Sequence, residues 1–325
     1  MDSILFIASN PVFVKPIADE LSVKYNVRTD FHKNLKNSDD FVSILEDMRS
    51  ADVTFVDWCD PLLIEVSRGL KTSKIIARLH SYEFFDGYVE HVNWNNIDKL
   101  ILVNDSLDNL IRYKIPFSLK KTRVIYHGID LNKFQFNENR PKSNTVGIAG
   151  FINYKKDPSF AIACFDEIYR ACPHLKFVWA GQHQDLRYHL DMINMMSKIR
   201  FPLSIIPWQD DMNKFFQSVD YIFSSSLFES CHLSILEGMA CGVIPIVRMW
   251  RGSENIYPSH SLFTMPAGAA KNISSLENGN LFGCKDRSEF LQKNRKYVEK
   301  YYSFTREIEE IDQLVQEVIH HDDKN

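Results

Sequence analysis

Long apolar runs are missing from this sequence, and none approaches the roughly 18 residues needed to cross a bilayer. The first ten residues, MDSILFIASN, have no basic stretch ahead of the apolar segment, so we predict no signal peptide. The six cysteines show neither a CxxC pair nor a regular spacing, which favours reduced thiols. These absences together predict a cytoplasmic protein. The formal net charge of −4 argues against bulk nucleic-acid binding.

The signatures of several enzyme classes are also missing. No DxD triplet follows a strand-like segment, and no cluster of His, Cys and carboxylate residues has the spacing of metal ligands. Neither GxSxG nor GxxxxGK[ST] occurs. Metal-dependent transfer and P-loop hydrolysis are therefore disfavoured, and we predict neither a metal nor a cofactor.

The length of the chain and its apolar pattern predict an α/β protein of two domains. Its 325 residues exceed the usual size of one hydrophobic core. Short apolar runs alternate with amphipathic stretches, which is typical of doubly wound βαβ units. The strands predicted in the first half are Ile4–Ala8, Val53–Val56, Ile75–Leu79, Lys99–Val103 and Arg123–Tyr126. Those in the second half are Thr145–Ala149, Lys176–Ala180, Leu203–Ile206, Tyr221–Ser225 and a strand that ends at Val247.

Polar segments suggest where the domains divide. Residues 132–144 lack periodicity and predict a linker, so we expect domains over 1–140 and 141–302. Residues 267–285 are rich in Gly, Asn and Ser and predict a loop. The last part of the chain is strongly helical with a break near Ser303, which makes 303–325 a separate C-terminal helix.

The segment 228–247, FESCHLSILEGMACGVIPIV, carries two glutamates eight positions apart. If Leu233–Ala240 is helical, Glu229 and Glu237 lie roughly 12 Å apart, at about 1.5 Å of rise per residue. That distance is too long for one shared proton or metal ion. It suits two carboxylates that accept hydrogen bonds from the two ends of a long ligand such as a sugar-nucleotide.

A glycine-rich strand end precedes two lysines. Gly150 ends the strand at 145–149, and Lys155 and Lys156 follow before a predicted helix at Pro158–Ala171. Backbone N–H groups and a lysine ammonium suit a diphosphate. The alternative is an ordinary turn with surface lysines, and we expect one of the two lysines to be solvated.

Other polar or aromatic residues follow strands. His80 either hydrogen-bonds a sugar hydroxyl or is a structural histidine, and Glu83 either orients it or starts the next helix. Trp208 is placed to flank a nucleobase, while Arg251 either meets a phosphate or is a surface residue. We interpret His127 as structural.

A basic cluster lies late in the first half. It consists of Lys114, Lys120, Lys121 and Arg123. It either touches an anionic membrane surface or forms a solvated loop.

Three of these segments resemble the retaining glycosyltransferases of the GT-B fold, in the large family-four group (glycosyl transferases group 1). FESCHLSILEGMACGVIPIV is similar to the E-x7-E motif of that family. VGIAGFINYKKDP resembles its GR-x4-KG segment, and VIYHGIDLNKF resembles its VIPNGID-x-x-F. The resemblance implies two Rossmann-like domains that face each other across a cleft, with the C-terminal helix packed back on the first domain.

The resemblance also implies roles for the site residues. Glu229 would contact the donor sugar and Glu237 the ribose, while Lys156 would bind the diphosphate. Backbone N–H groups from Cys231 to Leu233 would face the sugar and the diphosphate. His80 matches a position where many relatives have an active-site histidine or another polar residue.

Departures from the family pattern concern the phosphate site. Phe151 stands where relatives have an arginine, Asp157 replaces a glycine, and the segment from Ser230 to His232 replaces Gly-Phe-Gly. We hypothesise that Arg251 substitutes for the missing arginine. His232, at the expected start of a helix, is a further candidate contact for the donor sugar.

The resemblance implies a metal-independent, retaining glycosyltransferase for polysaccharide biosynthesis. It would transfer a hexosyl or N-acetylhexosaminyl group from a UDP-sugar to a glycan, lipid-linked or protein acceptor, with possible peripheral contact to the inner membrane face. Two alternatives remain open. One is a non-catalytic partner subunit of a glycosyltransferase, and the other is a GT-B-like sugar-nucleotide epimerase or hydrolase.

Overall fold

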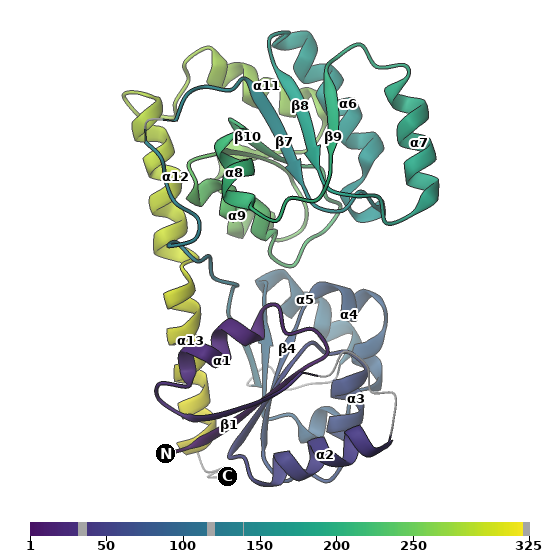
Figure 1. The fold of residues 1–325 in the computed structure, drawn as a ribbon, viewed down its shortest axis with the longest axis vertical. Coiled ribbons are helices and arrows are strands. Elements are labelled where there is room, and N and C mark those ends of the chain that lie inside the picture. Colours follow the sequence, from purple (N-terminus) through teal and green to yellow (C-terminus); the bar gives the residue numbers. More distant parts are fainter. Residues whose placement is uncertain (32–37, 116–120, 139, 321–325) are drawn as a thin grey trace. The chain divides into compact units, whose positions relative to one another are not determined.

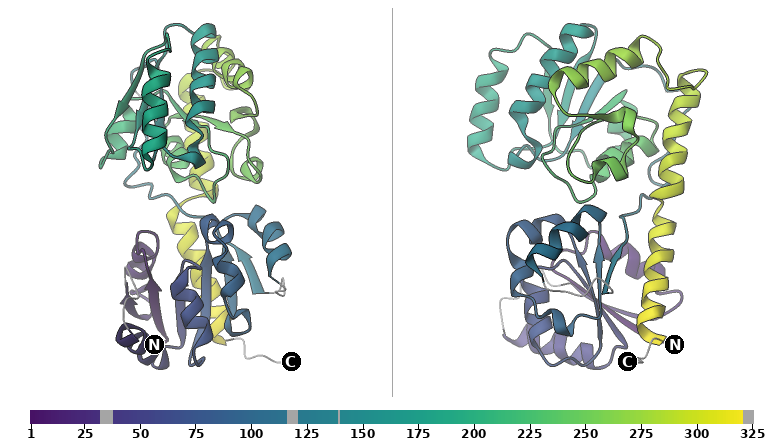
Figure 2. Two further views of the ribbon diagram at one scale, coloured as in Figure 1. Left: turned by 90° about the vertical axis from the view of Figure 1, so that its right-hand side faces the viewer. Right: turned by 180° about the vertical axis from the view of Figure 1, so that it is seen from behind.

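The computed structural model describes residues 1–31, 38–115, 121–138 and 140–320, and shows two compact α/β units (Figure 1). The first unit comprises Met1–His127 and Thr305–Asn325, and the second comprises Gly128–Phe304. Each unit contains one six-stranded sheet in which neighbouring strands are parallel, with helices on both faces (Figure 2). The predicted fold class, two doubly wound α/β units, is confirmed.

The sheet of the first unit has the strand order β2-β1-β3-β4-β5-β6. Its strands are β1 (Ser3–Ala8), β2 (Asn26–Asp30), β3 (Val53–Asp57), β4 (Lys74–Leu79), β5 (Lys99–Leu102) and β6 (Thr122–Val124). The inner strands are buried on both faces, which explains their continuous apolar sequences. Strand β2 was not predicted, because an edge strand with half-exposed polar residues lacks that signal.

Two helices of the first unit begin at a residue whose side chain caps them. The helices of this unit are α1 (Val14–Leu21), α2 (Ser38–Arg49), α3 (Pro61–Arg68), α4 (Ser81–Phe85), α5 (Asp105–Lys114) and α13 (Phe304–His320). The Asp60 side chain caps α3 by accepting from the N–H of Leu62. Asn104 caps α5 in the same way, by accepting from the N–H of Ser106.

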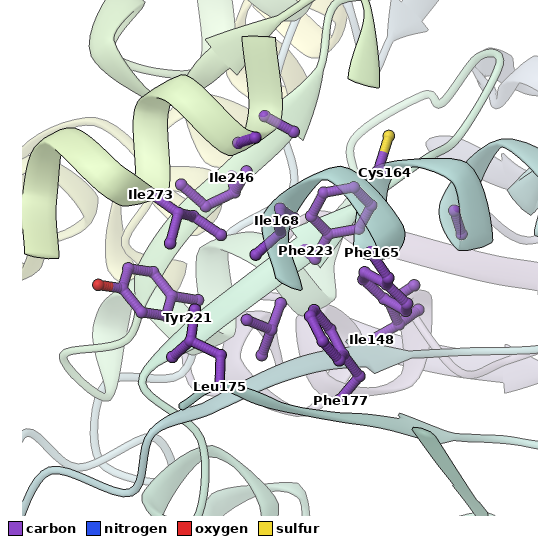
Figure 3. Packing of buried hydrophobic residues seen from close by; sticks show 14 of the residues in the cluster. Ile148, Cys164, Phe165, Ile168, Leu175, Phe177, Tyr221, Phe223, Ile246 and Ile273 are labelled. Atoms are coloured by element: carbon purple, nitrogen blue, oxygen red, sulfur yellow. The ribbon is translucent and has the colours of Figure 1, made fainter. Parts of the chain in front are cut away.

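The sheet of the second unit has the strand order β12-β11-β10-β7-β8-β9. Its strands are β7 (Thr145–Ala149), β8 (Lys176–Ala180), β9 (Leu203–Ile206), β10 (Tyr221–Ser224), β11 (Ile244–Arg248) and β12 (Leu262–Phe263). Its helices are α6 (Pro158–Ala171), α7 (Leu186–Met196), α8 (Met212–Gln217), α9 (Leu233–Ala240), α10 (Ser253–Ile256), α11 (Pro266–Glu277) and α12 (Arg287–Tyr301). The core between α6 and the sheet is aromatic: the ring of Phe165 lies 4.4 Å from that of Phe177 and 5.2 Å from that of Phe223 (Figure 3).

The loop predicted over 267–285 is wrong, because helix α11 occupies most of it. Pro266 opens the helix at a position that needs no N–H donor. Ala269, Ile273 and Leu276 recur at helical spacing and are buried. Of the residues that suggested a loop, Gly268, Asn272, Ser274 and Ser275 lie among these apolar positions, and Asn278, Gly279, Asn280 and Gly283 follow the helix.

The two units join at a different place from the predicted boundary near residue 140. Segment 128–140 belongs to the second unit, because Ile129 exchanges backbone hydrogen bonds with Tyr302 and Phe304. Gly128 is required there, since a Cβ atom on it would lie 2.4 Å from the Cα of Phe304. Helix α13 belongs to the first unit, where Asp312 pairs with Lys24.

Candidate donor-binding site

The predicted donor-binding residues lie at the carboxyl ends of strands in the second unit. Gly150 follows β7, Trp208 follows β9, the segment 225–232 follows β10, and Arg251 follows β11. Doubly wound sheets bind ligands at this edge. We therefore describe the polar contacts at these four strand ends.

A buried carboxylate at this edge is held by two lysines. Glu229 is 6% exposed, and its Oε1 and Oε2 atoms lie 2.7 Å and 2.5 Å from the Nζ atoms of Lys156 and Lys155. Ser226 donates a further hydrogen bond to Oε1. Burial raises the pKa of Glu229, but the charges of Lys156 and Lys155 outweigh it and hold the pKa well below its usual range. Both lysines pair with the carboxylate, so the expectation that one of them contacts only solvent is wrong. We call Lys155, Lys156, Glu229 and His232 the Glu229 cluster.

The tautomer of His232 follows from its neighbour. The Lys156 ammonium lies 2.6 Å from His232 Nε2. An ammonium can only donate hydrogen bonds, so Nε2 must be the acceptor. Burial and the Lys156 charge lower the pKa of His232 to about 3, so the ring is neutral at pH 7. Its proton is therefore on Nδ1, which is buried and has no hydrogen-bond partner among the described residues.

Local turns place the lysines beside Glu229. The Asn153 side chain accepts a hydrogen bond from the N–H of Lys156. Asp157, which stands where relatives have glycine, adopts φ of +45° and caps α6 with its side chain. Gly150 has φ of +127°, and a Cβ atom there would lie 3.3 Å from Cε of Lys156. Gly150 therefore gives the lysine side chain its room.

Glu237 differs from Glu229 in having no counter-charge in contact. It lies half-buried on α9, which spans the predicted range Leu233–Ala240. Its carboxylate makes no hydrogen bond in the part of the chain that is described. Burial raises the pKa of Glu237 to about 7, with Lys133 opposing the shift. Such a group gains from a ligand that donates hydrogen bonds to it.

The start of α9 lies between the two glutamates. Leu233 is its first residue, so the Leu233 N–H belongs to the first turn, whose donors have no acceptor inside the helix. Cys231 is buried just ahead of it. This arrangement is compatible with the expected backbone contacts to a sugar and a diphosphate, which remain a prediction.

Phe151, at the position where the family pattern has an arginine, packs against Trp208. The ring centroids of Phe151 and Trp208 lie 4.8 Å apart, and Trp208 remains 47% exposed. Arg251 is exposed in the turn after β11. Arg248 is the arginine that turns inward there, with an ion pair of 2.8 Å to Asp157. The role of Arg251 as the substitute therefore remains a prediction.

In the first unit, His80 belongs to a buried ring of polar groups. Its Nε2 lies 3.1 Å from Asp57, its Nδ1 lies 3.3 Å from Nε2 of His127, and Nδ1 of His127 lies 3.3 Å from Glu307. Arg78 closes the ring through ion pairs with Asp57 and Glu307. Burial lowers the pKa of His80 to about 3, although Asp57 opposes the shift.

The hydrogen bonds of this ring assign its protons. Arg78 keeps Asp57 ionised, so Nε2 of His80 carries a hydrogen and its Nδ1 accepts from His127. These contacts are compatible with the structural role of His127, which stays a prediction. The sequence alone did not identify Asp57, Arg78 or Glu307 as members of this ring. The one available signal was for Asp57, which is a carboxylate at the end of the apolar strand β3.

Glu83 and Trp58 fix the position of His80. Oε1 of Glu83 accepts hydrogen bonds from the N–H groups of His80 and Cys59, so Glu83 both starts α4 and holds its N-cap residue. The Trp58 ring stacks on His80 at 3.8 Å, and Trp58 adopts φ of +78°, which is unusual for a bulky residue.

The segment that carries the Glu229 cluster is similar to a known protein family. Residues 143–278 match the family model for glycosyl transferases group 1. The match runs from β7 to α11 and includes all four residues of the cluster. No curated protein sequence matches the chain.

Solved glycosyltransferase structures share the whole fold. HepE from Anabaena, in complex with UDP and glucose, has a TM-score of 0.78 at 13% identity, and the match covers 97% of this chain and 100% of HepE. A glycosyltransferase from Rickettsia africae has a TM-score of 0.73 at 14% identity and 99% coverage of both chains. Sucrose-phosphate synthase from Thermosynechococcus elongatus has 0.74 at 12%, with 98% and 99% coverage. The fold is therefore GT-B.

The described residues contain neither a membrane-spanning helix nor a group of metal ligands. No helix in the ranges given above is both long and apolar enough to pass through a membrane. The same ranges contain no group of three His, Cys, Asp or Glu residues arranged to hold a metal ion. In the basic cluster, Lys114 pairs with Glu90 and Arg123 pairs with Glu317, while Lys120 lies outside the described residues.

Proposed function

We propose that this protein is a glycosyltransferase that takes a sugar from a nucleotide-sugar donor. The Glu229 cluster carries the proposal, because it combines an ionised buried carboxylate, two lysines and an imidazole N–H that has no partner among the described residues. The carboxylate suits sugar hydroxyls, and the lysines suit a diphosphate. The family match over 143–278 and the GT-B fold support the same activity.

The proposed chemistry needs charge stabilisation at the leaving group. Breaking the anomeric C–O bond places negative charge on the β-phosphate. Lys156 and the N–H groups at the start of α9 would stabilise that charge without a metal ion. Glu229 would hold the donor sugar, Glu237 the ribose and Trp208 the nucleobase. Retention of the anomeric configuration is proposed from the resemblance alone.

The identity of both substrates is also a proposal. HepE was crystallised with UDP and glucose, which supports a UDP-hexose or UDP-N-acetylhexosamine as the donor here. A glycan, a lipid-linked sugar or a protein would be the acceptor, bound on the His80 side. A cytoplasmic location and peripheral membrane contact remain predictions, and ion pairs at Lys114 and Arg123 reduce the positive charge available for such contact.

Nucleotide binding followed by turnover tests the function. UDP, GDP and ADP are first compared by thermal shift, and sugar-nucleotides of the stabilising base are then screened by mass spectrometry for hydrolysis and transfer. We expect one nucleotide to raise the melting temperature and its sugar derivative to turn over. No shift with any nucleotide would contradict the proposal and would favour a non-catalytic partner subunit.

The two glutamates provide the first test by mutation. Glu237→Gln removes a charged acceptor of ribose hydroxyls and should weaken nucleotide binding roughly 10-fold or more, since hydrogen bonds to charged groups contribute about 1.5–3 kcal/mol. Glu229→Gln should leave UDP affinity closer to wild type and lower turnover. Isothermal titration and initial rates measure the two effects. Equal effects of both variants on UDP binding would contradict the assigned ends.

A further inference from the structure

The two lysines of the Glu229 cluster are held in place by backbone contacts. Leu227 donates its N–H to the carbonyl of Lys155 at 2.9 Å, and the Ser225 hydroxyl donates to the carbonyl of Lys156. Both donors belong to the segment that follows β10, which also carries Glu229. The lysines and the carboxylate are therefore positioned by one pair of neighbouring segments before any ligand binds.

The cluster carries one more positive charge than negative charge. Lys155 and Lys156 contribute two positive charges, Glu229 contributes one negative charge, and His232 is neutral at pH 7. The neighbouring Asp157 is neutralised by its ion pair with Arg248. An anion at this position would thus meet an uncompensated cation.

A second observation points to a missing ligand. His232 is 5% exposed, and its Nδ1–H has no partner among the described residues. A buried donor without an acceptor destabilises the protein, because it has lost its hydrogen bond to water. A phosphate or sugar oxygen bound at the cluster would satisfy it.

The side chain of Lys155 has the freedom that a second phosphate ligand needs. It is 36% exposed, compared with 12% for Lys156. Its ammonium contacts Oε2 of Glu229, whereas Oε1 is already shared by Lys156 and Ser226. Lys155 can therefore turn to a ligand while Glu229 keeps its other partners, and the released Oε2 becomes an acceptor for a sugar hydroxyl.

We propose that Lys155 is the second diphosphate-binding cation of this site, in the role of the arginine that is absent at Phe151. This inference rests on the proposed function. It replaces our earlier candidate, Arg251, because Arg251 is exposed beyond β11 whereas Lys155 already contacts the cluster. Donor binding moves Lys155 from Glu229 to the diphosphate.

The test compares ligands with and without phosphate groups. Affinities of UDP, GDP, ADP and the matching nucleosides are measured by isothermal titration for wild type, Lys155→Met and Lys155→Arg. We expect Lys155→Met to weaken binding of the preferred diphosphate roughly 10- to 100-fold, with nucleoside affinity unchanged. Lys155→Arg should restore most of the loss. Lys214→Met, at a side chain that is 86% exposed, is the matched control.

The possible outcomes separate the two proposals. Wild type that binds none of the nucleotides overturns the proposed function and this inference together. If wild type and Lys155→Met bind a diphosphate equally tightly, only the role of Lys155 is overturned. A loss seen in Arg251→Met and absent from Lys155→Met would return the role to Arg251. Should Lys155→Met fail to fold, Lys155→Gln and Lys155→Arg provide the same comparison.

Discussion

At the scale of residues, the two candidate sites use buried charge in different ways. In the Glu229 cluster the lysines outnumber the carboxylate, and one imidazole N–H is left for a ligand. In the ring around His80, Asp57 and Glu307 both pair with Arg78, and each also contacts one of the two histidines. The first arrangement is prepared for an anion, and the second is satisfied within the protein.

Breaking the Lys156–Glu229 pair should destabilise the second unit. Lys156→Met leaves a buried carboxylate with only the more exposed Lys155, so we expect a loss of about 2–4 kcal/mol in the free energy of unfolding. Glu229→Gln in the same chain removes the uncompensated charge and should recover much of that loss. Urea unfolding of both single variants and the double variant measures the coupling. Additive losses would show that the pair contributes nothing.

Glu83 should make the stability of the first unit fall at high pH. Burial raises the pKa of Glu83 to about 8 in the folded state, from 4.5 for an exposed glutamate. The folded state therefore holds this proton more tightly, and the stability it contributes is complete below pH 4.5 and lost as pH rises through 8. Glu83→Gln keeps the Oε1 acceptor for the N–H groups of Cys59 and His80 but cannot titrate.

Melting temperatures between pH 5 and pH 9 measure this effect. Wild type should lose stability relative to Glu83→Gln across that range, by an amount on the order of a few kcal/mol. Glu20→Gln, at an exposed position of α1, is the control and should follow wild type. Parallel curves for wild type and Glu83→Gln would mean that Glu83 is ionised in the folded state.

At the scale of elements, the segment at Gly128 can pack against Ser303 and Phe304 only because Gly128 has no side chain. A Cβ atom there would lie 2.4 Å from Cα of Phe304 and 2.8 Å from the carbonyl oxygen of Ser303. Gly128→Ala should therefore separate the segments that carry Ile129 and Phe304, at a cost of about 1–3 kcal/mol. Hydrogen exchange of the Ile129 and Phe304 amides should become faster.

A second glycine provides the control for that substitution. A Cβ atom on Gly69 would lie 3.1 Å from the flexible end of Leu45, and the nearest backbone atom, the carbonyl oxygen of Val66, would be at an ordinary contact distance of 3.6 Å. Gly69→Ala should therefore change the melting temperature less than Gly128→Ala does. An equal change in both variants would contradict the steric explanation.

Elements with strong local signals were predicted from the sequence with accurate bounds. Helices α6 and α9 and strands β8 and β9 coincide with their predicted ranges, because apolar periodicity and, for α6, an initial proline specify them. Strand β2 and helix α11 were missed because their residue types resemble those of loops. A local pattern does not show whether the rest of the fold covers a segment of polar and small residues.

The candidate sites show the same limit over longer distances. The family motif pointed to Glu229 and Lys156, which are 73 positions apart and in contact in the structure. No motif pointed to Glu307, which lies 229 positions from its partner Arg78. For the second contact of Glu229, Lys155, the sequence predicted only that one of two adjacent lysines in a turn is solvated, without saying which one. Side-chain direction in η4 (Tyr154–Lys156) decides that point, and a sequence pattern does not report it.

At the scale of the whole molecule, each unit has its own sheet and core, so a local defect should stay within one unit. Glu307→Ala removes one partner of the buried Arg78 and should cost the first unit about 3 kcal/mol. Hydrogen exchange measured by mass spectrometry should become faster in β4 and α13 and stay unchanged in β7 and β8. A matching increase in the second unit would show that the two cores unfold together.

The first unit is assembled from two distant parts of the chain, residues 1–127 and helix α13. During translation the ribosome completes the whole of Gly128–Phe304 before it makes α13. The second unit is contiguous and can fold on the nascent chain. In the first unit, Arg78 cannot pair with Glu307 until α13 emerges from the ribosome. The part of the protein that is synthesised first is therefore the part that finishes folding last, and the interval between the two events is when it would need a chaperone.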